Sequence, residues 1–259
     1  LIFSAALAVA ICFGTQSEAF ADEQMPDFSW PKDESVIPGK GNLRNNVWFQ
    51  AHFKNRREGF WKNHKEMEGA VVFLGDSITE GWDHRLATDF PEFKVCSRGI
   101  GGDVTRTVIY RLKEDVMDLN PCAVVLLIGT NDLDEKNSPE VISANTIEIL
   151  ERLKEFNPNL PVLYCKIMPR SKEPDFRTSA IMITNKQVSD YITKAKNPNW
   201  YIVDTWSIYA TPKGVVSGET MKDYLHPVSE AYAKWRDLVK PILHKLNLED
   251  KSKVADQAK

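Results

Sequence analysis

The chain has 259 residues, of which 42% are hydrophobic and 27% charged, and its formal net charge is -3 at pH 7. This length fits one large α/β domain at least as well as two small ones. The slightly acidic balance and the lack of any run of Lys or Arg exclude a nucleic-acid-binding protein, because contact with a phosphate backbone requires an excess of positive charge.

The first 21 residues are predicted to be a signal peptide. Residues 1–14 are almost wholly apolar, but this run is shorter than the roughly 18 residues that a membrane-spanning helix needs. Ala19, Phe20 and Ala21 supply the small-x-small pattern that signal peptidase recognises, so we expect cleavage before Asp22. The prediction is an exported protein, periplasmic or extracellular, with no stable membrane insertion.

Two tails are expected to flank a single domain. Residues 22–41 contain several Pro and Gly with little periodicity, and residues 247–259 are polar and charged. Such segments are typical of chain ends outside a packed core. The sequence therefore predicts an N-terminal extension at 22–41, one domain at 42–246 and a polar C-terminal tail at 247–259.

Within the predicted domain, short apolar runs alternate with segments of helical period. A helix at 45–64 with three Phe residues comes first. Each apolar run is bounded by Gly, Pro, Asn or Asp, as expected for buried strands. The five proposed strands are 70–74, 93–96, 123–128, 162–167 and 200–203. Strand followed by helix, repeated, predicts an α/β fold, a three-layer α/β/α sandwich around a five-stranded parallel sheet of flavodoxin-like type.

The helical segments between the strands carry apolar stripes on one face. One segment has Val104, Val108 and Leu112, and similar stripes fall in 142–153 and 181–192. A last helix is expected over 228–242, with Pro241 predicted to kink it.

Cysteine and histidine usage gives no metal signature. Cys96, Cys122 and Cys165 lie in or beside apolar runs, so we expect buried thiols, and the odd count leaves at least one of them free. There is no Cys-x-x-Cys and no His-Glu-x-x-His, and the five histidines are scattered along the chain. We expect no metal site.

The residues that follow the strands are the candidates for chemistry, because ligands bind beyond the carboxyl ends of strands in an open parallel sheet. The first such segment, GDSITEG at 75–81, places Ser77 where a buried strand turns into a helix. Two interpretations stay open for this segment alone. Ser77 is either a nucleophile or the N-cap of a helix, with Glu80 completing a capping box.

A nucleophilic serine needs a base, and the base needs a group that orients it. Asp223 and His226, in DYLHP at 223–227, supply an Asp-x-x-His pair before the last helix. By itself this spacing also fits an exposed turn. An oxyanion further requires donors fixed in advance. GIGGD at 99–103 offers backbone N–H groups and GTND at 129–132 offers the Asn131 amide, although a Gly-rich turn and a helix cap are the simpler alternatives.

Taken in chain order, these four segments resemble the Ser, Gly, Asn and His blocks of the GDSL esterases in their SGNH hydrolase form. The resemblance spans 71–246 and is nearest to the branch of platelet-activating-factor acetylhydrolase subunits and bacterial carbohydrate acetylesterases. It implies the SGNH hydrolase fold, an ester hydrolase without a cofactor, and a triad of Ser77, Asp223 and His226. It also implies an oxyanion hole made by the N–H groups of Ser77 and Gly102 with the Asn131 side chain. Ile78 replaces the Leu of the family name.

The resemblance implies a small-molecule or carbohydrate ester as substrate, most simply a short acyl ester such as acetyl on carbohydrate. The alternatives are a lysophospholipase or thioesterase of the same family, and a non-catalytic carbohydrate-binding relative. A flavodoxin-like nucleotide protein is a further reading of the fold alone. Arg98, Arg106 and Arg170 follow strands and are candidates for contact with an anionic substrate, with structural ion pairing as the alternative.

Overall fold

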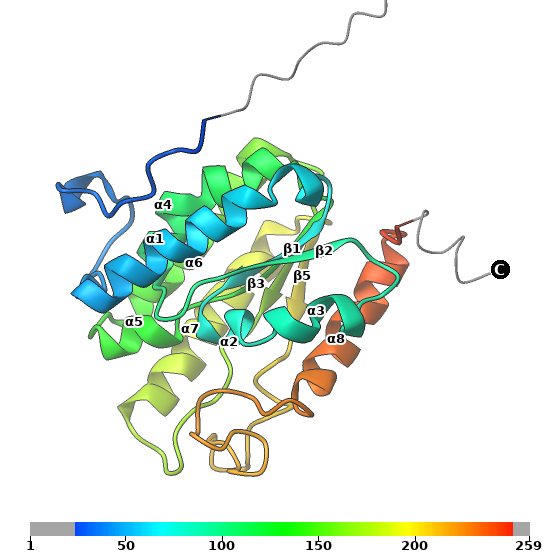
Figure 1. Ribbon diagram of the computed structural model, residues 1–259. Helices are drawn as coiled ribbons and strands as arrows, with labels where there is room; N and C mark the ends of the chain where they lie inside the picture. The colour runs from blue at the N-terminus through cyan, green and yellow to red at the C-terminus, as the bar shows by residue number, and fades with distance from the viewer. Residues whose placement is uncertain (1–23, 251–259) are drawn as a thin grey trace, which may run out of the picture.

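The computed structural model describes residues 24–250 (Figure 1). The predicted signal peptide at 1–21 lies outside the described residues, and so does most of the predicted C-terminal tail. Within residues 24–250, no helix has the length and apolarity needed to cross a bilayer.

Five parallel strands form one sheet in the order β2-β1-β3-β4-β5, so the predicted fold class is confirmed. Val72 of β1 lies opposite Cys96 on one side and Val124 on the other. Parallel pairing in this register brings the carboxyl ends of β1, β2 and β3 to the same edge of the sheet. The strands are β1 (Val71–Gly75), β2 (Val95–Gly99), β3 (Ala123–Leu127), β4 (Val162–Cys165) and β5 (Trp200–Val203).

The edge strand β2 differs most from its prediction. We expected it at 93–96, but it begins at Val95 and continues through Ser97 and Arg98 to Gly99. Phe93 is buried in the turn before the strand, where its apolar side chain resembles a strand residue in the sequence. Ser97 and Arg98 pair with Phe73 and Leu74 through their backbones, which no apolar pattern reveals.

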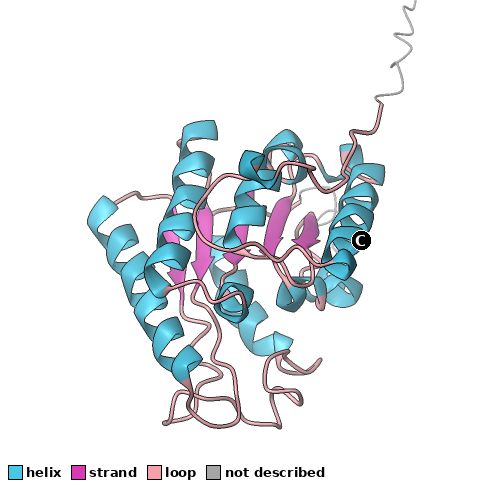
Figure 2. Ribbon diagram, turned by 90° about the vertical axis from the view of Figure 1, so that its left-hand side faces the viewer, coloured by secondary structure: helices cyan, strands magenta, loops and turns pink. Residues whose placement is uncertain are grey.

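Helices cover both faces of the sheet, as Figure 2 shows. Val108 and Leu112 of the predicted first stripe pack with β1 and β3 on one face. Trp82 and Trp235 pack against the other face, with ring centroids 4.7 Å apart. The first face is covered by α4 (Thr105–Asp115), α6 (Pro139–Phe156) and α7 (Phe176–Ala195). The second face is covered by α2 (Ser77–Glu80), α3 (Asp83–Asp89) and α8 (Tyr232–Lys245).

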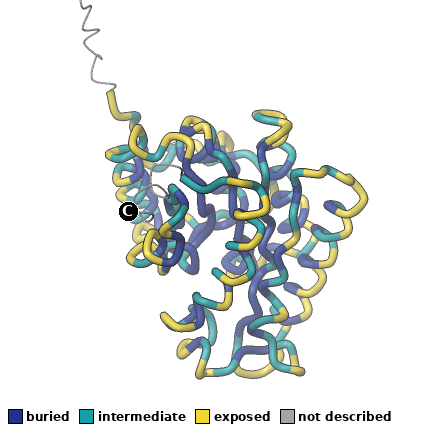
Figure 3. The backbone as a smooth tube through the Cα atoms, turned by 90° about the vertical axis from the view of Figure 1, so that its right-hand side faces the viewer, coloured by how far each residue is buried: buried dark blue, intermediate teal, exposed yellow. Residues whose placement is uncertain are grey.

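The last helix begins later than its apolar pattern predicts. Val228 and Ala231 precede the first turn of α8, and Pro241 lies inside the helix. Among the predicted thiols, Cys96 and Cys165 are buried and Cys122 is half-buried, and all three are free. The strands β1, β3 and β4 are fully buried, and buried backbone runs through the centre of the molecule, as the dark blue tube in Figure 3 shows.

The N-terminal part of the described chain packs over the outside of α4. The helix α1 (Val47–Lys62) starts at the cap Asn46 and buries Phe49 and Phe53 in a cluster with Ile100. The residues before α1 are bound by Arg106 of α4, which donates to the backbone carbonyls of Ile37, Pro38 and Gly41. Part of the predicted extension at 22–41 is therefore bound to the domain and is not a free tail.

Candidate active site

Ser77 is the first residue of α2, directly after β1. The N-cap of this helix is Asp76, whose Oδ1 accepts the N–H of Ile78 at 3.0 Å. The interpretation of Ser77 as the cap is therefore wrong. Glu80 does not complete a capping box either, because its carboxylate accepts the N–H of Gly101 at 2.5 Å and lies 2.9 Å from His52 Nε2.

The structure brings Ser77, His226 and Asp223 together. The Ser77 Oγ lies 2.8 Å from His226 Nε2, across 149 positions of sequence. The other ring nitrogen, Nδ1, lies 2.6 Å from Asp223 Oδ2. When Nδ1–H donates to that carboxylate, Nε2 carries the lone pair that faces the serine hydroxyl. A serine, a base and an orienting carboxylate are thus in hydrogen-bond contact.

The Asp223 carboxylate is fixed by the short turn that carries the histidine. Its Oδ1 accepts the backbone N–H groups of Leu225 at 3.1 Å and His226 at 2.8 Å. Tyr224, which directly follows Asp223, adopts a left-handed conformation with φ of 60°. Partial burial raises the pKa of Asp223, but the hydrogen bonds from the His226 ring and the two N–H groups outweigh it, so the pKa is lowered overall. The carboxylate therefore stays ionised beside the imidazole.

The Gly and Asn segments are in contact with each other. The Asn131 Nδ2 donates to the backbone carbonyl of Asp103 at 3.0 Å, and Asn131 is not a helix cap, because α5 (Thr130–Asp134) is capped by Gly129. An amide nitrogen has two hydrogens, so one N–H of Asn131 remains for another acceptor. Gly102 has a φ of 85°, a conformation that favours glycine.

A buried cation connects these segments. Arg111, on α4, is fully buried and donates to Asp103 Oδ2 at 2.8 Å. The same guanidinium donates to the carbonyls of Gly75 at 3.1 Å and Arg98 at 2.8 Å, which lie at the ends of β1 and β2. Thr107 donates a further hydrogen bond to Asp103. The Ser, Gly and Asn segments are therefore held to one another through Arg111 and Asp103.

The Ser and Asn segments each contain a buried carboxylate, Asp76 and Asp132. Burial raises the pKa of Asp76 to about 7, against the hydrogen bond from Ile78, and burial likewise raises that of Asp132 to about 7, against the bonds from Thr105. The Asp76 Oδ2 has no hydrogen-bond partner within the described part of the chain, so no donor stabilises a negative charge on that oxygen. Asp132 accepts the hydroxyl of Thr105 at 2.6 Å.

The three arginines considered for an anionic substrate have structural partners. Arg98 is buried and donates to the carbonyls of Asp115 and Ser97. Arg106 binds the N-terminal segment, and Arg170 donates to Thr130 O at 3.1 Å and pairs with Asp134. Sequence reasoning missed a different arginine, Arg44, which lies against Gly102 and Asn131. The sequence gives no signal for Arg44, because it lies before α1 and outside the four segments that resemble the family.

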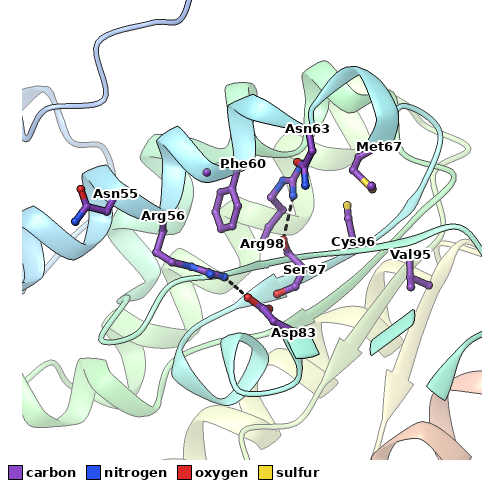
Figure 4. Close-up of a pocket in the computed structure, with 11 residues that line it drawn as sticks. Asn55, Arg56, Phe60, Asn63, Met67, Asp83, Val95, Cys96, Ser97 and Arg98 are labelled. Atoms are coloured by element: carbon purple, nitrogen blue, oxygen red, sulfur yellow. Dashed lines mark hydrogen bonds and ion pairs between the residues drawn. The ribbon is translucent and has the colours of Figure 1, made fainter. Parts of the chain in front are cut away.

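A cavity of about 360 Å³ lies between α1 and the edge strand β2 (Figure 4). Its polar groups are mostly engaged with one another, since Arg56 pairs with Asp83 at 2.6 Å and Arg98 donates to Ser97 O. No residue of the predicted triad or oxyanion hole lines it, and of the three arginines considered only Arg98 does. Across residues 24–250, no group of three His, Cys, Asp or Glu side chains is arranged to hold a metal ion.

Comparison with known proteins connects this geometry to a family. The model of the GDSL-like lipase/acylhydrolase family matches residues 73–234, which contain all the predicted site residues. The human platelet-activating factor acetylhydrolase IB subunit alpha2 is 28% identical over 206 residues, or 77% of this chain and 82% of the relative.

Solved structures share the fold. A Bacteroides fragilis protein assigned as an acylhydrolase has a TM-score of 0.64 at 25% identity, over 73% of this chain and 96% of that one. An acetyl xylan esterase has a TM-score of 0.56 at 19% identity, over 67% of this chain and 98% of that one. At this identity, the similarity to the acetyl xylan esterase shows a shared fold only.

The buried Asp76 gives a prediction for stability against pH. Its pKa is about 7 in the folded protein and 3.8 in the unfolded chain, so between these values only the folded state keeps the proton. Stability therefore falls as the pH rises through this window. We predict that Asp76→Asn, which keeps the capping oxygen but carries no charge, reduces the loss of unfolding free energy between pH 5 and pH 8 by about 2 to 3 kcal/mol. Urea titrations at both pH values measure it, and equal losses in both proteins would contradict the assignment.

Proposed function

Because the chain belongs to the GDSL-like lipase/acylhydrolase family and is a carboxylic ester hydrolase, we propose that it is a serine esterase with Ser77 as its nucleophile. The observation that carries the proposal is the contact of Ser77 Oγ with His226 Nε2 at 2.8 Å, with Asp223 at 2.6 Å behind the imidazole. This arrangement has the three functions that a serine nucleophile requires.

In the first half of the proposed reaction, Ser77 Oγ attacks the ester carbonyl carbon while its proton passes to His226 Nε2. The carbonyl oxygen becomes an oxyanion that accepts hydrogen bonds from the N–H groups of Ser77 and Gly102 and from the Asn131 side chain. As the first residue of α2, Ser77 has an N–H outside the hydrogen-bond ladder of the helix. The intermediate collapses, His226 returns the proton to the departing alcohol oxygen, and the acyl group stays on Ser77.

In the second half, water attacks the acyl-enzyme. His226 takes a proton from the water, and the same three donors receive the oxyanion. Collapse of the second intermediate releases the acid, and the proton on His226 returns to Ser77 Oγ. Asp223 holds the imidazole in one tautomer and stabilises its positive charge in both halves. The cycle balances without a cofactor.

The nucleophile is tested by substitution. Ser77→Ala and His226→Ala should each lower turnover of 4-nitrophenyl acetate on the order of a million-fold, as measured for a serine triad acting as a unit. The matched control is Ser207→Ala, because Ser207 is an exposed serine that forms hydrogen bonds with Asp204 and is not part of the triad. Wild-type turnover by Ser77→Ala would refute the assignment. An enzyme that loses its activity on treatment with EDTA would indicate metal-dependent hydrolysis.

For the substrate, we propose short acyl esters, acetyl above all, carried on carbohydrate. The relative named as an acetylhydrolase supports the acyl group. An aromatic surface supports the carbohydrate, because the face of an indole ring packs against the apolar face of a sugar ring. Trp48 is 60% exposed and lies flat on His52, with ring centroids 5.2 Å apart. His52 contacts Glu80, which holds the N–H of Gly101, so the indole lies beside the Gly segment.

The carbohydrate proposal predicts a substrate-dependent effect of one substitution. Trp48→Ala should lower kcat/KM on acetylated xylan roughly fivefold, the equivalent of about 1 kcal/mol for one aromatic contact. It should leave 4-nitrophenyl acetate hydrolysis unchanged. Phe156→Ala is the control, since Phe156 is an exposed aromatic residue at the last turn of α6. Equal effects on both substrates would contradict a contact between Trp48 and the sugar. Faster hydrolysis of long-chain than of acetyl esters would favour the lysophospholipase and thioesterase alternative.

We also propose that the protein is exported to the periplasm or beyond the cell. The support is the sequence pattern, an apolar run at 1–14 followed by Ala19, Phe20 and Ala21. Mass spectrometry of the protein isolated from the exported fraction should give an N-terminus at Asp22. An uncleaved chain found only in the cytoplasm would contradict this proposal.

A further inference from the structure

Arg44 lies in the segment before α1, outside the part of the chain that the family model matches. Its side chain is 17% exposed. A methyl group placed on Gly102 would meet Arg44 Nη1 at 3.1 Å and its Cδ at 3.2 Å, so the arginine packs directly on this glycine. Its Nη1 also donates to Asn131 Oδ1 at 3.4 Å. Arg44 therefore contacts two of the three residues proposed to bind the oxyanion.

The Arg44 guanidinium is held in this place by an acidic side chain at the end of α5, the helix that contains Asn131. Arg44 Nε donates to Glu135 Oε1 at 2.6 Å. Glu135 follows Asn131 by four positions, and its N–H bonds the Asn131 carbonyl, so both side chains lie on one side of a single turn. A guanidinium has five donors in one plane, which lets Arg44 bind both residues at once.

The contact with Asn131 decides which way the amide faces. With Oδ1 towards Arg44, Nδ2 donates one hydrogen to the carbonyl of Asp103 and keeps the second for the substrate oxyanion. A rotated amide would place its NH₂ group against the guanidinium and its oxygen against the Asp103 carbonyl. Both contacts would then join like partners, donor to donor and acceptor to acceptor, which is unfavourable in a buried site.

From these contacts we infer that Arg44 is a positioning residue for catalysis, which acts by fixing the Asn131 amide as an oxyanion donor. The inference rests on the proposed esterase function. It assigns to the N-terminal segment a part in the active site that the family motifs do not contain.

The test is a double-mutant cycle on 4-nitrophenyl acetate. Arg44→Met should lower kcat roughly ten- to a hundredfold, less than the hundred- to thousandfold expected for loss of a whole donor in Asn131→Ala. KM should stay within about threefold, because the affected interaction forms in the transition state. In the Asn131→Ala background, Arg44→Met should cause no further loss of kcat, since the residue through which it acts is gone.

A second pair of variants separates positioning from charge and from folding. Arg44→Lys keeps the charge but not the planar donors, so it should restore only part of kcat. Glu135→Gln, which weakens the grip on Arg44, should lower kcat in the wild type and not in Asn131→Ala. Arg106→Ala is the control, because Arg106 also holds the N-terminal segment but directs its hydrogen bonds to the carbonyls of that segment and not to Asn131. It should lower Tm without a matching loss of kcat.

The inference is overturned if Arg44→Met keeps kcat within twofold of wild type, or if its loss multiplies with that of Asn131→Ala. Full recovery by Arg44→Lys would equally overturn it in favour of a charge effect. If Arg44→Met does not fold, the lysine and Glu135→Gln variants decide by the same cycle. Failure of the proposed function looks different, because Ser77→Ala would then be as active as the wild type.

Discussion

The ion pair between Arg111 and Asp103 connects the parts of the active site. Both side chains are fully buried, and removal of one partner would leave an uncompensated charge in the interior. From this position Arg111 binds the carbonyl that ends β1 and one near the end of β2, while the Asp103 carbonyl accepts the Asn131 amide. Ser77, Gly102 and Asn131 come from three different strand ends, and this pair fixes their relative positions.

The packed sheet and the helices α1 and α2 support this arrangement from two sides. Apolar clusters on both faces of the sheet make the strand ends rigid, so small loops there keep a defined shape. From outside, Glu80 binds the N–H of Gly101, and Arg56 binds the carbonyl of Gly99 at 2.9 Å. The oxyanion loop is therefore enclosed by α1 and α2. The Asp223 and His226 turn is the more exposed half of the site, with side chains 57% and 38% accessible.

Much of this arrangement follows from the sequence. The alternation of apolar runs and helical stripes gave the fold class, and the rule for parallel sheets located Ser77, Gly102, Asn131 and the Asp223 turn at one edge. The family resemblance inferred from those four segments is confirmed by the family match. The ends of β2 were not predictable, because Ser97 and Arg98 join the sheet through backbone bonds alone.

Arg44 and Arg111 were not predictable for a related reason. In the sequence Arg111 is one polar residue of an amphipathic helix, and Arg44 is one of several charges before the first helix. Their importance comes from contacts across 87 positions to Asn131 and 36 to Gly75, which no local pattern contains. At this site, the long-range contacts of polar side chains could not be predicted from the sequence.

Activation of the Ser77 hydroxyl by His226 can be measured by covalent labelling with a fluorophosphonate, which reacts with activated serines, followed by peptide mass spectrometry. We expect stoichiometric modification at Ser77 in the wild type and loss of labelling in His226→Ala. Modification at another serine, or an unlabelled protein that still hydrolyses esters, would contradict it.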